Sequence, residues 1–264
     1  MSAETGVRPL VLPVSGAHLA RAGELRRQFA SAEPFPLVVL DDFLDPQLAQ
    51  GLLEEFPDVT AMPRTGDGVF GDKRELAAVA GAGPSGRRFH EAMTSPAFAS
   101  FLGEVTGFDV FVDPDLFGGG FHQGADGSYL DMHVDFNIHP HKADWLRMLN
   151  ILVYLNPNWD EAWGGHLLVK SAVEQEPRAI APVFNRAVIM RTADNTFHGY
   201  RRMSLPTGVT RRSVAVYAYR QVRVGEYLPH STNWVPERGL GRKAVAQYLR
   251  VRTKVKNILR PPRA

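Results

Sequence analysis

The chain has 264 residues, of which 44% are hydrophobic and 22% are charged, and its formal net charge is +2. These proportions are ordinary for a folded globular protein and argue against a disordered chain. Cysteine is absent, which excludes disulfides and thiolate metal sites and leaves histidine and carboxylate side chains as the metal ligands.

The charge is unevenly distributed along the chain. The segment from Arg238 to Ala264 contains nine Lys or Arg and no acid, so the preceding 237 residues carry about −7, which is +2 less the +9 of the tail. The first residues, MSAETGVRPL, lack the basic-then-apolar pattern of a signal peptide. No apolar run reaches the ~18 residues that a membrane helix needs. We therefore expect no transmembrane segment and a cytoplasmic protein.

The first part of the chain predicts helices around one buried strand. In chain order these are a helix at 19–29, a strand at 36–40, a helix opening at 45 and a helix from 95 to 107. Asp45 is placed to cap the second helix, with Pro46 in its first turn. Residues 60–90 are rich in Gly, Ala and Pro, which favours a loop or short helix near the entrance of a site.

Between residues 108 and 219 the sequence changes to short β-branched and aromatic runs separated by turn residues. The runs are DVFVD, SYLDMHVDF, MLNILVYLN, GHLLVK, AVIMR and RRSVAVYAY. No helical period survives in this region. Short strands of regular spacing predict a β-sandwich or barrel, with the preceding helices packed on its outside.

The basic C-terminal segment predicts a helix that docks through one apolar stripe and leaves its bases in solvent. The stripe comprises Ala244, Tyr248, Val251, Val255 and Ile258. The alternative is a contact between this segment and nucleic acid, anionic lipid or an acidic partner. The bases are not interleaved with aromatic residues in the way that favours nucleic acid, so we expect no nucleic-acid partner.

The segment MHVDFNIHPH, residues 132–141, concentrates side chains that bind metals. Alternation along a strand directs His133 and Asp135 to the same face, where an imidazole and a carboxylate can bind one metal ion. His139 and His141 share this spacing, but the proline between them predicts a loop. We expect these two histidines to be exposed, within reach of a substrate at the mouth of the site.

The best third ligand is His198, in TADNTFHGYRR, directly after the predicted strand AVIMR. Two histidines and one carboxylate form the facial arrangement of non-haem Fe(II) oxygenases. Arg211 follows 13 positions later and offers a planar fork for a carboxylate such as that of 2-oxoglutarate. Ser213 shares the strand face of Arg211 and adds a hydroxyl group, whereas Arg212 faces the other way.

In these residues the chain resembles the prolyl 4-hydroxylase-like group of 2-oxoglutarate and Fe(II) dependent oxygenases. The matching motifs are PFPLVVLDDFL, GSYLDMHVDFN, LNILVYLNPNW, WGGHLLV, FNRAVIM, TFHG and GVTRRSVAVYAY. The resemblance implies a mainly β fold with a double-stranded β-helix core of the jelly-roll, cupin-like type. It further implies a single oxygenase domain over residues 1–264, with N-terminal support over 1–107, the catalytic core over 108–220 and a basic extension over 221–264.

The resemblance also implies roles for particular residues. His133, Asp135 and His198 match the iron ligands, Arg211 matches the anchor for the distal carboxylate of 2-oxoglutarate, and the Tyr154 hydroxyl matches a support for that anchor. A core aromatic residue is the alternative for Tyr154. The expected cofactors are Fe(II), 2-oxoglutarate and O₂, with ascorbate as an additional reductant. Because Asp135 is present, the resemblance does not point to a halogenase, in which a small residue frees a site for chloride.

The implied activity is hydroxylation of an unactivated C–H bond, with release of succinate and CO₂. We expect a small-molecule substrate, such as an amino acid, a sugar or a natural-product intermediate, because no adjoining peptide-binding repeat domain is evident. Peptidyl-prolyl hydroxylation on a protein is the alternative, and a zinc-dependent hydrolase or a non-catalytic binding module is more remote. Loops at the mouth of the site would contact the substrate through Asn137, His139 and His122.

Overall fold

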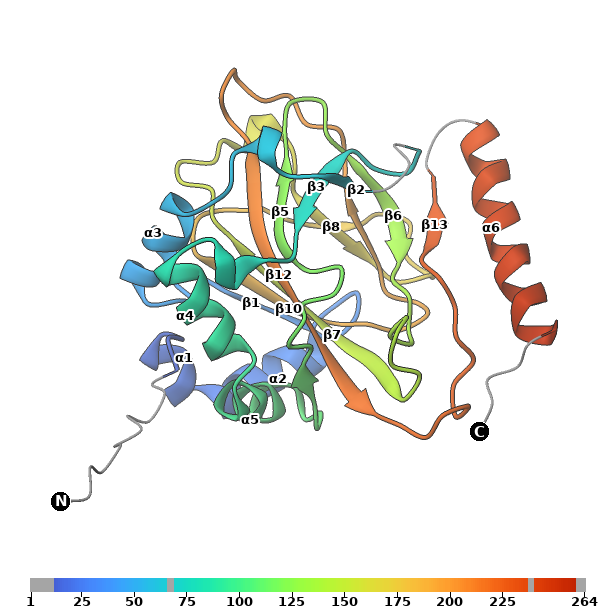
Figure 1. The fold of residues 1–264 in the computed structure, drawn as a ribbon, viewed down its shortest axis with the longest axis horizontal. Helices are drawn as coiled ribbons and strands as arrows, with labels where there is room; N and C mark the ends of the chain where they lie inside the picture. The colour runs from blue at the N-terminus through green and yellow to red at the C-terminus, as the bar shows by residue number, and fades with distance from the viewer. Residues whose placement is uncertain (1–11, 66–68, 237–239, 260–264) are drawn as a thin grey trace.

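The computed structural model describes residues 12–65, 69–236 and 240–259, and it is mainly β, with two antiparallel sheets (Figure 1). The larger sheet has the strand order β1-β10-β7-β12-β5-β3-β2, and β4 pairs with β12. Its strands are β1 (Leu37–Leu40), β2 (Arg64–Thr65), β3 (Lys73–Leu76), β4 (Phe111–Val112), β5 (Gly120–Gly124), β7 (Trp145–Tyr154), β10 (Arg186–Arg191) and β12 (Arg211–Gln221).

The smaller sheet faces the central strands of the larger one and has the strand order β13-β6-β11-β8-β9. Its strands are β6 (Leu130–Val134), β8 (Leu167–Lys170), β9 (Arg178–Ile180), β11 (Phe197–Tyr200) and β13 (Asn233–Val235). Side chains from both sheets line one shared cavity. The two sheets therefore form the double-stranded β-helix that the resemblance implied.

Helices cover the outer face of the larger sheet, and a last helix lies apart from them beside β13 (Figure 1). They are α1 (Gly16–Ala20), α2 (Ala22–Ser31), α3 (Pro46–Glu54), α4 (Pro84–Met93), α5 (Pro96–Thr106) and α6 (Leu240–Leu259), with short 3₁₀ turns η1 (Val59–Ala61), η2 (Val79–Gly81) and η3 (Glu161–Trp163). None of the helices within the described ranges is both long and apolar enough to span a membrane.

Alternation along the central strands separates the hydrophobic core from the inside of the β-helix. On β12, Val214 and Val216 are fully buried in the core formed with the helices. Residues at the odd-numbered positions of the same strand, Arg211, Ser213 and Tyr217, line the cavity between the sheets. Because neighbouring side chains on a strand point to opposite faces, one face of β12 builds the core and the other builds the site.

Several elements begin and end where the sequence predicted. The Asp45 carboxylate accepts hydrogen bonds from the backbone N–H groups of Gln47 and Leu48, which caps α3. Ser95 caps α5 in the same way through the N–H of Phe98, and α5 ends at Gly107 with a φ of 77°. The predicted strand at 36–40 is β1, and the helical pattern at 19–29 corresponds to α1 and α2.

Other segments differ from the prediction. Residues 60–90 were expected to be loop or short helix, but they contain β2, β3 and the first part of α4, which continues to Met93. His122, expected in a loop at the mouth of the site, lies instead on β5. β3 and β5 pair with each other, and β5 also pairs with β12. Pairing with strands distant in the sequence therefore stabilises β3 and β5, although their own residues show no clear strand pattern.

The predicted apolar stripe of the C-terminal helix is also wrong. Its members Ala244, Tyr248 and Val251 are exposed, and the side chains of Val255 and Ile258 lie outside the described part. Ala246 is instead the buried residue of α6, with 4% of its surface exposed. Arg242 forms an ion pair with Asp131, and its guanidinium lies 5.2 Å from the centre of the Tyr129 ring. These contacts turn the Arg242 and Ala246 face of α6 toward the body.

Candidate metal centre

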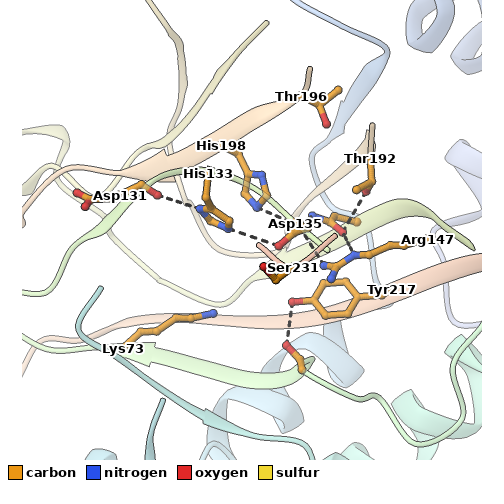
Figure 2. Close-up of polar contacts among 12 residues, drawn as sticks. Lys73, Asp131, His133, Asp135, Arg147, Thr192, Thr196, His198, Tyr217 and Ser231 are labelled. Carbon is orange, nitrogen blue, oxygen red and sulfur yellow. Dashed lines mark hydrogen bonds and ion pairs between the residues drawn. The ribbon is translucent and has the colours of Figure 1, made fainter. Parts of the chain in front are cut away.

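Strand pairing brings together two histidines that are far apart in the sequence. His133 on β6 and His198 on β11 are direct partners across the antiparallel pair, and their ring centroids are 4.2 Å apart. Asp135 follows directly after β6, and one ligand atom from each of the three residues lies within 4.8 Å of the others (Figure 2). Among the described residues this is the one such group of histidine and carboxylate side chains.

The distances and donor atoms of this cluster fit a single metal ion. Nε2 of His133 lies 3.4 Å from Oδ1 of Asp135, and Nε2 of His198 lies 3.4 Å from Oδ2. Two ligands that are each about 2.1 Å from one ion can be at most about 4.2 Å apart. Nδ1 of His133 donates a hydrogen bond of 2.9 Å to the backbone carbonyl of Asp131. That bond fixes the tautomer that leaves Nε2 available as a metal ligand.

The carboxylate of Asp135 is held by residues of β7 that the sequence did not identify. Nδ2 of Asn150 donates a hydrogen bond of 2.7 Å to Oδ2 of Asp135. The Arg147 guanidinium lies 3.1 Å from the same oxygen, and Figure 2 shows both side chains of this pair. Oδ1 of Asn150 accepts hydrogen bonds from Arg147 Nε at 2.9 Å and from Thr192 Oγ1 at 3.3 Å. The strand alternation that places Asn150 and Tyr154 on one face could have revealed Asn150.

The surroundings set the protonation states that metal binding needs. Burial opposes the charged form of Asp135, but the Arg147 charge, with contributions from the neighbouring His198 and His133, keeps the pKa of its carboxyl group well below the ordinary value. Burial, followed by His133, lowers the pKa of His198 to about 3. At neutral pH the cluster therefore offers an ionised carboxylate and a neutral His198 imidazole, which are the forms that bind metals.

The cavity that contains the cluster also contains Arg211 and Ser213 from β12. The cavity is about 60 Å³ in volume, and 7% of the Arg211 surface is exposed. Arg212 faces the opposite side of the strand, where it lies 5.9 Å from the centre of the Phe56 ring. Arg211 therefore points inward and Arg212 outward, as the alternation of the predicted strand required.

The Arg211 guanidinium is held in a fixed orientation. Its Nε donates a hydrogen bond of 2.7 Å to the carbonyl of Gly165, and one Nη donates to the Tyr154 hydroxyl at 3.3 Å. The guanidinium also lies 4.4 Å from the centre of the Tyr200 ring. Gly165 has a φ of 68°, and a Cβ there would come within 2.6 Å of Met203 and 3.2 Å of Arg211. A glycine is therefore required at this close approach.

A second cavity, of about 220 Å³, lies next to the metal cluster, and we call it the entrance cavity. Its lining residues are Phe70, Gly71, Lys73, Glu75, Gly118, Leu130, His133, Asp135, Phe136, Arg147, Tyr217, Thr232 and Trp234. Lys73 and Glu75 form an ion pair. Burial opposes the charge of Lys73, but Glu75 together with Tyr217 and Tyr200 outweighs this effect, and the pKa of Lys73 is raised. No sequence motif marked these two residues, although both fall in the segment predicted to lie near the entrance.

The three residues expected to contact the substrate have different environments. His122 lines the cavity of the metal cluster, and burial lowers its pKa to about 3, so it is neutral. Asn137 holds the segment 228–230 by two hydrogen bonds. Its Nδ2 donates to the carbonyl of Leu228 at 2.9 Å, and its Oδ1 accepts from the N–H of His230 at 2.8 Å. Asn137 lines neither cavity.

His139 corrects the expectation of an exposed loop histidine. It is 5% exposed, and its ring contacts those of Trp145 and Tyr219. Its Nε2 lies 3.5 Å from Oδ2 of Asp113, which is also buried. His139 is outside both cavities and packs in the interior, whereas His141 is exposed as expected. The proline between them does mark a loop, but that loop folds inward at His139.

Comparison with known proteins agrees with this geometry. Residues 119–219 match the family model of the 2OG-Fe(II) oxygenase superfamily, where 2OG is 2-oxoglutarate. No curated protein matches the chain. A prolyl 4-hydroxylase from Pseudomonas putida has a similar structure, with a TM-score of 0.55 and 16% identity, over 76% of this chain and 99% of that one.

Two further solved structures have the same fold. Prolyl 4-hydroxylase from Phytophthora capsici has a TM-score of 0.53 and 18% identity, over 96% of this chain and 82% of that one. A prolyl hydroxylase from Trichoplax adhaerens has a TM-score of 0.53 and 13% identity, over 78% of this chain and 93% of that one. Residues 119–219, which carry the metal cluster and Arg211, therefore match the 2OG-Fe(II) oxygenase superfamily, and the chain has the fold of the prolyl 4-hydroxylases.

Proposed function

We propose that the chain, as one domain over residues 1–264, is a dioxygenase that hydroxylates an unactivated C–H bond of a small molecule and releases succinate and CO₂. His133, Asp135 and His198 would hold Fe(II). Arg211, supported by Tyr154 and Ser213, would hold the distal carboxylate of 2OG. The observation that supports the proposal is that the three candidate ligands and Arg211 line one cavity.

The residues of the chain have separate tasks in this reaction. Bound Fe(II) and 2OG supply the oxidising chemistry with O₂. Asn150 and Arg147 hold one oxygen of Asp135, which fixes the orientation of this carboxylate. The fork of Arg211 offers two parallel N–H donors to a carboxylate. Side chains around the entrance cavity exclude bulk water from the reacting atoms.

The size of the entrance cavity supports a small substrate. Its volume is about 220 Å³. A cavity of about 150 Å³ holds benzene, and drug-sized ligands occupy about 300–1,000 Å³. The cavity therefore fits a molecule of about ten heavy atoms or one residue of a larger chain.

The alternative function is hydroxylation of a prolyl residue in a protein. The similar structure from Trichoplax adhaerens is a prolyl hydroxylase in complex with a peptide fragment of the hypoxia inducible factor oxygen degradation domain. A single residue of a peptide would also fit the entrance cavity. The two functions differ in what surrounds that residue, because a peptide has amide groups where a free amino acid has charges.

The test begins with binding and ends with turnover. Anaerobic calorimetry should give a tight site for Fe(II) in the wild-type protein and 2OG binding that depends on the metal. His198→Ala should lose Fe(II) binding and succinate formation, because two ligands hold a metal far more weakly than three. A panel of small molecules and proline-containing peptides should then show which class gives succinate together with a product heavier by one oxygen atom.

Absence of Fe(II) binding by the wild-type protein would refute the proposal and favour a non-catalytic module. Hydrolysis with zinc and without 2OG would favour a metal hydrolase.

A further inference from the structure

The entrance cavity contains an ion pair to which the binding of Fe(II) and 2OG assigns no task. Lys73 and Glu75 are two residues apart on β3, so both side chains point to the same face. Their side chains are 21% and 18% exposed, and they contact each other. The Lys73 side chain extends beneath the metal cluster with its ammonium group toward Tyr217 (Figure 2). Nε2 of His122 lies 3.5 Å from Oε1 of Glu75, on the cofactor side of the pair.

Lys73 and Glu75 balance each other's charge in the entrance cavity. His122, next to Glu75, is neutral at physiological pH, since burial lowers its pKa to about 3. A ligand with a single charge would therefore leave one uncompensated charge in a largely buried space, which is costly.

A zwitterion avoids this cost. If its two charges lie antiparallel to the pair, each faces the opposite charge on the protein and the total stays at zero. The ion pair of the protein does not have to break, because the four charges alternate around a ring. A neutral amide, as in a peptide, could form a hydrogen bond with Lys73 or Glu75 but would lack the attraction between two opposite charges.

The aromatic walls of the cavity favour the zwitterion over a sugar. Trp234 is already covered by Phe70, at 5.1 Å and 9° between ring planes, and by His133, at 4.6 Å. The Arg147 guanidinium lies 3.4 Å from the centre of the Tyr217 ring and 4.8 Å from that of Phe136. These rings are engaged with each other and with Arg147, and they form an apolar wall more than a stacking platform.

We propose that the entrance cavity binds a free α-amino acid as its zwitterion, with the substrate carboxylate on Lys73 and the substrate ammonium group on Glu75. This inference rests on the proposed function and names its substrate class. The substrate side chain lies along the aromatic wall and presents a C–H bond to the metal cluster. The reaction balances as R–H + 2OG + O₂ giving R–OH + succinate + CO₂, so one oxygen atom enters the C–H bond and the other enters succinate.

The test measures binding without turnover. The wild-type protein, loaded anaerobically with Mn(II) and 2OG, is titrated by calorimetry with each of the 20 amino acids and with the N-acetyl and amide forms of any that binds. We expect at least one free amino acid to bind. Blocking either terminus should weaken binding about 10- to 100-fold, since one charge–charge interaction is lost. Lys73→Met and Glu75→Gln should weaken binding of the free amino acid by a similar factor. Lys73→Met should not weaken binding of the amide form, and Glu75→Gln should not weaken binding of the N-acetyl form, because the interaction that each variant removes is already absent there.

Matched control variants are available on the surface. Lys243→Met on α6 and Glu104→Gln on α5 change the same residue types at exposed positions, and they should bind the amino acid like the wild-type protein. Circular dichroism and Mn(II) binding identify any variant that fails to fold, and the blocked ligands then test the inference on the wild-type protein alone. The inference is overturned if no free amino acid binds, if blocked forms or peptides bind equally well, or if a sugar binds instead. Failure of the wild-type protein to bind Mn(II) and 2OG would instead refute the proposed function.

Discussion

Arg147 and Asp135 form a buried ion pair at the metal cluster, with 3.1 Å between a guanidinium nitrogen and Oδ2 of the carboxylate. The side chain of Arg147 is 1% exposed, and that of Asp135 is 12% exposed. The pair connects β7 of the larger sheet to the segment after β6 of the smaller one. Because the same carboxylate is a potential metal ligand, its charge can be compensated by Arg147, by a cation, or by both.

Arg147→Met should therefore destabilise the metal-free protein much more than the metal-bound protein. Removal of one partner of a buried ion pair leaves an uncompensated charge and typically costs about 3–5 kcal/mol. A bound divalent cation supplies the missing positive charge, so saturating Mn(II) should recover most of the loss. Denaturant unfolding with and without Mn(II) measures the free energy of unfolding in both states. Arg191→Met, at an exposed position of β10, is the matched control. An equal loss with and without Mn(II) would show that Arg147 acts through packing alone.

Arg211→Ala should raise the 2OG concentration that gives half-maximal succinate formation by at least about tenfold. A hydrogen bond to a charged group contributes roughly 1.5–3 kcal/mol, and the guanidinium fork can make two of them. Arg212→Ala should leave this concentration unchanged, because Arg212 lies on the outer face near Phe56. Steady-state assays over a range of 2OG concentrations distinguish the two variants. If Arg212→Ala has the larger effect, the carboxylate anchor is not where we propose it.

The three residues of the candidate metal cluster were all named from the sequence, two of them because their spacing is local. His133 and Asp135 follow from alternation along one strand, and His198 was found by its position after the next predicted strands. The residues that hold Asp135 were missed, since Arg147 and Asn150 on β7 approach this carboxylate only when the chain folds. Residues that hydrogen-bond to a metal ligand belong to no fixed sequence motif.

The errors at the C-terminus and at His139 have the same physical origin. Apolar side chains predicted the buried face of α6, yet an ion pair between Arg242 and Asp131 lies on the face that docks. A proline and polar neighbours predicted an exposed His139, yet a buried Asp113 accompanies its ring in the interior. In both cases a specific polar partner from a distant segment outweighs the average preference of the residue type.

The ion pair between Asp41 and Arg186 should make stability depend on pH in the acid range. Hydrogen bonds from Arg186, one of them 2.9 Å long, lower the pKa of Asp41 below its ordinary value. The contribution of the pair is therefore present above the unfolded pKa of about 3.9 and is lost as the pH falls through the lower folded value. The Asp41 side chain is 62% exposed, so solvent screening limits the contribution to about 0.2–1 kcal/mol. Asp41→Asn should lower the free energy of unfolding by this amount at pH 7, and the difference should shrink as the pH falls below about 4. A difference that is constant from pH 7 to pH 3 would contradict the assignment.

Arg242→Met should loosen α6 without changing the metal cluster. Arg242 connects α6 to β6 through the Asp131 carboxylate, whereas His133 uses the backbone carbonyl of Asp131, which the substitution leaves in place. Loss of a partly buried ion pair of about 1 kcal/mol should speed hydrogen exchange in α6 roughly fivefold. Fe(II) affinity should stay within about twofold of that of the wild-type protein, since no ligand moves.

Lys243→Met, at the next position and exposed, is the control and should leave both the hydrogen-exchange rate and the Fe(II) affinity unchanged. Hydrogen exchange with mass spectrometry and anaerobic Fe(II) titration make the two measurements. A large loss of Fe(II) affinity in Arg242→Met would mean that α6 holds β6 in the geometry that the metal requires.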